Sequence, residues 1–115
     1  MRYIDLLIER KKIRDEYLNN IDEYFRRIKK FFVEKLEDAR VLVFGSYVKG
    51  GFGPESDIDI LVISSKIKND QEKLRLIYEI RKEIGFRSPF EFHIAKEEEY
   101  KNWWVNFIKN DYIEL

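Results

Sequence analysis

The sequence contains no cysteine, which excludes a disulfide framework, a thiolate zinc site and a cysteine nucleophile. It also lacks an excess of charge of either sign, because 22 Lys and Arg balance 22 Asp and Glu. General nucleic-acid and membrane binders usually carry a basic excess, so the composition favours neither class. No apolar run approaches the roughly 20 residues of a membrane span, and the charged N-terminus is unlike a signal peptide. We therefore expect a cytoplasmic protein that does not bind membranes and does not bind nucleic acid strongly.

The sequence does contain enough apolar material for one folded domain. Hydrophobic residues make up 44% of the 115 residues and aromatic residues 16%, which excludes a disordered chain. A chain of this length has room for a single core. We expect one domain over residues 1–115, with a helical segment over residues 1–39 and an α/β core over residues 40–115.

Helical periodicity covers the first third of the chain. From Tyr17 to Ala39 the apolar residues recur at steps of three and four, which predicts a helix with a wide buried face. A similar stripe begins upstream with Ile4, Leu7 and Ile8. Asn20 and Glu23 have the spacing of a capping box, so the pattern favours two helices in series over one bent helix.

The rest of the chain alternates between strand and helix patterns. Strands are expected over Arg40–Phe44, Asp57–Ser64 and Phe90–Ala95. One helix is expected to begin at a capping Asp70 and to stop at Gly85, and a last helix to begin with three glutamates after residue 96. Their expected core positions are Leu74, Ile77, Ile80 and Ile84 in the first, and Tyr100, Trp103, Trp104, Phe107 and Ile108 in the second. The order predicts an α/β (α+β) fold with one sheet covered by helices.

Two acidic residues alternate at the start of the second predicted strand. Asp57 and Asp59 leave the same face about 6.6 Å apart, at a rise of about 3.3 Å per residue. Carboxylates at this spacing can converge on a hard divalent cation, which would relieve the repulsion that raises the pKa of paired acids. Alternatively, the two acids are simply exposed at a strand entrance.

The loop before that strand, GSYVKGGFGPES, holds four of the five glycines. Such a loop in the middle of a small domain is typical of a functional segment. Gly45 would let the backbone approach a phosphate, and Ser46 with the following amides would form a small anion-binding turn. Lys49 either adds positive charge to this turn or is a solvated loop lysine. A triphosphate bound here would lie beside a cation held by Asp57 and Asp59.

The pair Gly45-Ser46, followed after ten residues by Asp57-Ile58-Asp59, is expected by chance in roughly one chain in a thousand of this length. It resembles the signature of the DNA-polymerase-β-like nucleotidyltransferases. The stretch VLVFGSYVKGGFGPESDIDILV is similar to the minimal nucleotidyltransferase (MNT) domains of prokaryotes. The resemblance implies a mixed sheet with a nucleotide cleft and a catalytic core over residues 40–115. It also implies two Mg²⁺ ions on the two aspartates, phosphates on the Gly-Ser turn, and transfer of AMP from ATP to a hydroxyl.

The family uses a third carboxylate, commonly Asp, on a later strand. The only acid inside the strand expected at Phe90–Ala95 is Glu91, so the resemblance makes Glu91 the expected third metal ligand and the base. His93 lies two residues on and shares its face; it is either structural, or it orients Glu91 or contacts the nucleotide. The apolar neighbours of Trp103 and Trp104 favour core packing over stacking on a base.

The resemblance also implies a partner. Stand-alone domains of this kind are typically antitoxins encoded beside a HEPN-domain ribonuclease toxin, and they can adenylylate a tyrosine on it. We therefore predict a metal-dependent protein adenylyltransferase that uses ATP. The alternative is a non-catalytic nucleotide-binding module that neutralises its partner by contact, for which the stripe at Ile4, Leu7 and Ile8 would suit a partner or a homo-oligomer. Glu91 discriminates: if it points into the cleft with Asp57 and Asp59, an enzyme is favoured.

Overall fold

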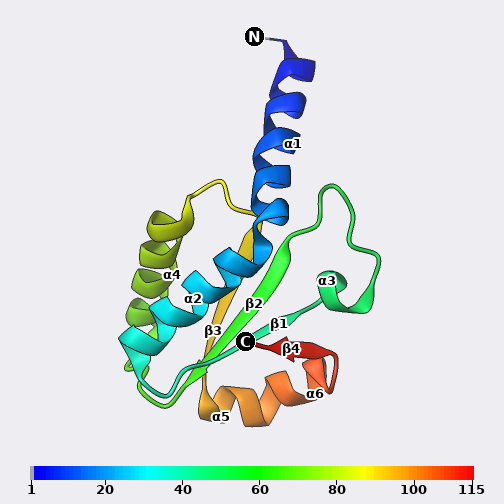
Figure 1. Cartoon of the computed structure of the whole chain (residues 1–115). Coiled ribbons are helices and arrows are strands. Elements are labelled where there is room, and N and C mark those ends of the chain that lie inside the picture. The colour runs from blue at the N-terminus through cyan, green and yellow to red at the C-terminus, as the bar shows by residue number, and fades with distance from the viewer. Residues whose placement is uncertain (1) are drawn as a thin grey trace.

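A four-stranded mixed sheet organises the chain in the computed structural model, which describes residues 2–115 (Figure 1). The strands are β1 (Arg40–Phe44), β2 (Ile58–Ser64), β3 (Phe90–Lys96) and β4 (Tyr112–Glu114), in the spatial order β3-β2-β1-β4. β1 runs antiparallel to both β2 and β4, whereas β2 and β3 are parallel. The expected mixed sheet and fold class are therefore confirmed.

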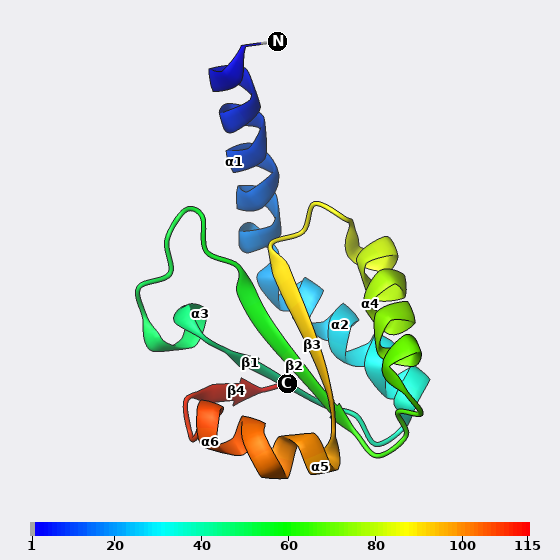
Figure 2. The same ribbon diagram turned by 180° about the vertical axis from the view of Figure 1, so that it is seen from behind.

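The helices lie on both faces of this sheet and beyond it. They are α1 (Tyr3–Asn19), α2 (Ile21–Leu36), α3 (Ser46–Lys49), α4 (Asp70–Ile84), α5 (Glu97–Glu99), the π-helical turn η1 (Tyr100–Trp104) and α6 (Val105–Ile108). α2 and α4 cover one face, and the segment from α5 to α6 lies on the other (Figure 2). α1 projects away from the body of the molecule. Within residues 2–115, no helix combines the length and apolarity needed to cross a bilayer.

The alternation along β2 divides its side chains between two clusters. Ile58, Ile60 and Val62 pack with the buried residues of α2 and α4. Leu61 and Ile63 pack on the opposite face with residues that include those of α6. Successive side chains of a strand point to opposite faces, so Asp59 shares the face of Leu61 and Ile63, as expected.

The predicted break between two helices near Asn20 is confirmed, but the prediction of a capping box between Asn20 and Glu23 is wrong. The backbone oxygen of Asn20 accepts from the amides of Glu23 and Tyr24, at 3.1 and 3.2 Å. The Asn20 side chain instead donates from Nδ2 to the carbonyl of Glu16, at 2.9 Å. The main chain thus satisfies the amides that the side chain was expected to cap.

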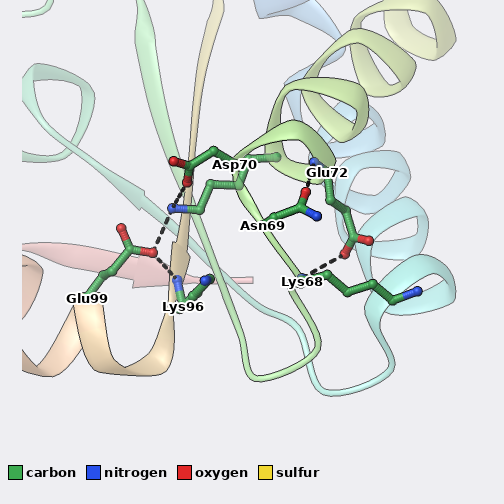
Figure 3. A network of polar contacts seen from close by, with 7 residues as sticks. Lys68, Asn69, Asp70, Glu72, Lys96 and Glu99 are labelled. Carbon is green, nitrogen blue, oxygen red and sulfur yellow. Dashed lines mark hydrogen bonds and ion pairs between the residues drawn. The ribbon is translucent and has the colours of Figure 1, made fainter.

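The start of α4 differs from the prediction by one residue. Asn69, not Asp70, is the N-cap, because its Oδ1 accepts from the backbone N–H of Glu72 at 2.9 Å (Figure 3). Lys73 in the first turn reaches Glu99 of α5 with an Nζ–Oε1 distance of 2.6 Å. This pair links α4 to the segment that begins the second helical layer.

The core face of α4 also differs in part. Leu76, Ile80 and Ile84 are buried at steps of four, whereas Leu74 is 69% exposed. Leu74 lies two residues from Leu76, which places it about half a helical turn away from the core. Gly85, with φ of +109°, ends the helix as predicted.

The last predicted helix is interrupted by a π-helical turn. Trp103 and Phe107 are 56% and 57% exposed, so core packing is wrong for these two residues. Trp104 is half-buried and Ile108 is buried. A π-helical turn contains more residues per turn than an α-helix and changes which side chains share a face. β4 was not predicted; it forms by pairing with Leu42–Phe44 of β1.

Candidate functional site

The candidate site lies on the face of the sheet that carries the segment from α5 to α6. In the register of the parallel pair, Asp59 of β2 is opposite Glu91 of β3, and Leu61 is opposite His93. Asp59 also pairs with Phe44 of β1, so it stands on a central strand. Two neighbouring strands therefore bring Asp59, Glu91 and His93 to one face.

These three side chains converge. His93 Nε2 lies 3.6 Å from Asp59 Oδ1 and 3.8 Å from Glu91 Oε1. One ligand atom from each residue lies within 4.8 Å of the others. The side chains of Asp59, His93 and Glu91 are 25%, 29% and 52% exposed, so solvent and solutes can reach all three.

The surroundings of Asp59 disfavour its negative charge. Burial is the main cause that raises the pKa of Asp59, and the nearby charge of Glu91 raises it further, while His93 opposes the shift. A bound cation would remove this conflict. Two carboxylates and one imidazole are donors that divalent metals accept, so the residues present fit a metal ion.

Gly45 brings the end of β1 against Asp59. It has φ of +79°, a conformation that favours glycine. A Cβ atom at this position would overlap Asp59 Oδ2. The carbonyl of Gly45 then accepts from the amides of Val48 and Lys49, at 3.1 and 3.0 Å, which starts α3. The predicted Gly-Ser turn therefore lies directly beside the converging acids.

Two predicted site residues lie outside this cluster. Asp57 is exposed and is not one of the three converging residues. It borders a cavity of about 840 Å³, lined also by residues of α1 and by Arg87, Ser88 and Pro89. Lys49 Nζ lies 4.0 Å from Asp111 Oδ2, and both side chains are more than half exposed.

A comparison with family models decides the classification. The family described as "Nucleotidyltransferase domain" matches residues 25–114. The chain belongs to the nucleotidyltransferase domain family.

Known relatives carry adenylyltransferase names. Two proteins of Methanocaldococcus jannaschii share the name "Putative protein adenylyltransferase". MJ0141 is 34% identical over 54% of this chain and 61% of its own length, and MJ1379 is 35% identical over 61% and 72%. "Spectinomycin 9-adenylyltransferase" of Enterococcus faecalis is 36% identical over 66% of this chain and 31% of its own length. The chain thus spans less than two thirds of MJ0141 and of the spectinomycin enzyme.

Solved structures share the fold. A crystal structure described as a "putative nucleotidyltransferase" has a TM-score of 0.66 and 34% identity, over 79% of this chain and 96% of that one. One from Sulfolobus solfataricus has a TM-score of 0.57 and 20% identity, over 94% and 84%. The toxin–antitoxin structure MntA-HpeT has a TM-score of 0.57 and 13% identity, over 77% and 69%. The expected resemblance to MNT-type nucleotidyltransferases is confirmed.

The structure also contains a contact that the sequence does not predict. The guanidinium of Arg14 in α1 donates to the carbonyls of Gly53, at 3.0 Å, and Ser56, and lies 4.8 Å from the ring centre of Phe52. It holds the loop that leads to Asp57. The contact joins residues about 40 positions apart, and no local pattern signals it. For His93, the signal was its two-residue spacing from Glu91.

Proposed function

We propose that this nucleotidyltransferase domain transfers AMP from ATP to a hydroxyl of a partner protein, in a reaction that depends on a divalent cation. One observation carries the proposal: Asp59 and Glu91 converge on an accessible face beside the Gly45 turn. The adenylyltransferase names of three relatives support AMP as the transferred group. The proposed unit is the single domain 1–115, with residues 1–39 as its helical segment and 40–115 as its catalytic core.

In this proposal the site residues have two roles, which are binding of metal and phosphate and transfer of a proton. Asp57, Asp59 and Glu91 are the proposed ligands of two Mg²⁺ ions, which would polarise the α-phosphate and stabilise charge on the leaving group. Gly45 and Ser46 would hold the phosphates at the start of α3, where backbone N–H groups lack helical partners.

In the proposed reaction, Glu91 acts as the general base for the acceptor hydroxyl. The acceptor oxygen attacks the α-phosphorus, the bond from that phosphorus to the bridging oxygen breaks, and pyrophosphate leaves. Glu91 accepts the hydroxyl proton, a role that suits a half-exposed carboxylate. Lys49 would add positive charge beside the departing phosphates once it leaves Asp111.

The proposed acceptor is a HEPN-domain toxin, with this protein as its cytoplasmic antitoxin. The fold shared with MntA-HpeT supports a toxin partner in general terms. α1 offers a surface for such a partner or for a second copy, because Tyr3, Ile4 and Ile8 are 73%, 56% and 59% exposed. Apolar side chains gathered on a projecting helix are typical of an interaction site.

A second candidate function is a non-catalytic nucleotide-binding module that neutralises the partner by contact. The position of Asp57 favours it, since this residue lies outside the converging group. Glu91 is the residue on which the two candidates differ: it reaches the cluster, which favours the enzyme, but its side chain is 52% exposed.

Intact-mass spectrometry tests the proposal. The protein is incubated with ATP and either Mg²⁺ or Mn²⁺, alone and with the product of a neighbouring HEPN gene. We expect an added AMP on the partner with wild type and with Glu97→Gln, an exposed acid outside the site, but none with Asp59→Asn and much less with Glu91→Gln. A stable complex without any AMP increment would contradict the enzyme and support the binding module.

A further inference from the structure

His93 converges with the two carboxylates without bonding to them. Its Nε2 distances of 3.6 and 3.8 Å exceed those of a hydrogen bond. An ion with bonds of about 2.1 Å separates neighbouring ligands by about 3.0 Å in an octahedron and by about 3.4 Å in a tetrahedron. The two separations from His93 exceed these values by less than 1 Å, and all three ligand atoms lie within 4.8 Å of one another, so small side-chain movements would enclose a small divalent ion.

The fold holds the imidazole in this position. His93 lies within the paired part of β3, opposite Leu61. Its ring centre is 5.7 Å from that of Phe44 and 5.4 Å from that of Trp104, so aromatic side chains from two other elements flank it. The Asp59 carboxylate occupies the space beside Gly45 that a Cβ atom would fill. A site whose ligands are already placed binds its ion with less loss of conformational freedom.

The nitrogen donor gives this site a chemistry different from an all-carboxylate site. Mg²⁺ takes oxygen ligands almost exclusively, whereas imidazole suits first-row transition metals. We propose that His93 Nε2 is a direct metal ligand beside Asp59 and Glu91, and that this set selects a divalent transition ion over Mg²⁺. This inference rests on the cation site of the proposed function and replaces its Mg²⁺ at this position.

The test uses Mn²⁺ as the probe and the full chain without nucleotide. Free Mn²⁺ is counted by electron paramagnetic resonance, and Mg²⁺ competition gives the ratio of the two affinities. Pulsed resonance of bound Mn²⁺ then detects coupling to a directly bound ¹⁴N. The chain contains one histidine, so an untagged sample assigns an imidazole coupling to His93 without ambiguity.

Two variants sharpen the result. His93→Gln removes the imidazole nitrogen and keeps a polar side chain, while His93→Asp makes the ligand set all oxygen. We expect ¹⁴N coupling in wild type and none in either variant. The preference for Mn²⁺ over Mg²⁺ should fall by about tenfold or more in His93→Asp.

The proposal is overturned if wild type binds no Mn²⁺, if bound Mn²⁺ shows no ¹⁴N coupling, or if His93→Asp keeps the wild-type preference. If circular dichroism shows that His93→Asp does not fold, the presence or absence of ¹⁴N coupling in wild type alone decides whether His93 is a ligand. The outcome is separate from that of the proposed function. Coupling without AMP transfer would contradict only the transferase, and AMP transfer without coupling would contradict only His93 as a ligand.

Discussion

The two faces of the sheet have been built for different purposes. On one face, α2 and α4 cover the larger apolar cluster, which has sixteen buried residues in the described part of the chain, whereas the cluster on the other face has six. On the other face, the segment from α5 to α6 covers only part of the sheet and leaves Asp59, Glu91 and His93 accessible. Most buried apolar side chains therefore lie on the face covered by α2 and α4 (the closed face), and the candidate site lies on the opposite, open face.

Two aspartates show the same contrast in their electrostatics. Asp38, just before β1, accepts hydrogen bonds from the hydroxyl of Ser64, at 2.5 Å, and from the amide of Ser65, at 3.0 Å. These donors lower the pKa of Asp38 to about 2. Asp59 has the opposite surroundings, and its pKa is raised by burial and by Glu91. The fold stabilises the charge of one aspartate and disfavours that of the other.

The largest expected difference between the two faces is in the free energy of unfolding lost when a side chain is truncated. Phe32→Ala on the closed face should lower the free energy of unfolding by about 3–5 kcal/mol, because it leaves a cavity in a fully buried cluster. Trp103→Ala on the open face should cost under about 1 kcal/mol, because that side chain is 56% exposed. Urea denaturation measures both free energies of unfolding. Similar losses in the two variants would contradict the claim that the closed face contributes more to stability.

Two glycines test whether the space beside Asp59 on the open face is needed for cation binding. Gly45 and Gly51 have nearly the same φ, +79° and +78°, but only at Gly45 would a Cβ meet Asp59. Each Gly→Ala variant should lose about 1–3 kcal/mol from backbone strain, because a positive φ disfavours a residue with a Cβ atom. Gly45→Ala should in addition weaken divalent-cation binding by about tenfold or more, whereas Gly51→Ala should not. Isothermal titration with Mn²⁺ measures the difference, and equal affinities would show that Asp59 adapts freely.

The sign of the pH dependence distinguishes the two aspartates. The pKa of Asp38 is depressed in the folded state, so its contribution is present above its ordinary pKa and is lost as pH falls from about 4 to about 2. Asp38→Asn should therefore cost about 1 kcal/mol at pH 7, a value reduced for the exposure of this residue. The cost should shrink as pH falls towards 2.5 in chemical denaturation. A cost that does not change with pH would assign it to packing.

Much of this fold was accessible from sequence because its signals are local. Alternating or continuous apolar runs predict β1, β2 and β3 to within one residue at each end. The family resemblance predicted that Glu91 would join Asp57 and Asp59, and the structure brings Glu91 to Asp59 but leaves Asp57 outside the converging group. These features depend on residues close together in the chain, or on a spacing that the family shares.

The parts that could not be predicted depend on tertiary contacts. The π-helical turn exposes Trp103 although its neighbours are apolar. β4 forms because its three residues pair with β1. The hydrogen bond from Arg14 to the loop before Asp57 joins segments that are far apart in the sequence. The convergence of His93 with Asp59 requires the register of β2 and β3, which no single-strand pattern contains.

Thermal unfolding of Asp59→Asn, with and without a divalent cation, tests most directly whether the open face is kept for binding at the expense of stability. Because the folded-state pKa of Asp59 is raised, wild type loses stability as pH rises through its ordinary and then its folded-state pKa. At pH 7 the variant should melt at a higher temperature than wild type without metal. Added Mn²⁺ should raise the melting temperature of wild type but not that of the variant. A variant that melts lower without metal, or that Mn²⁺ stabilises as much as wild type, would contradict the account.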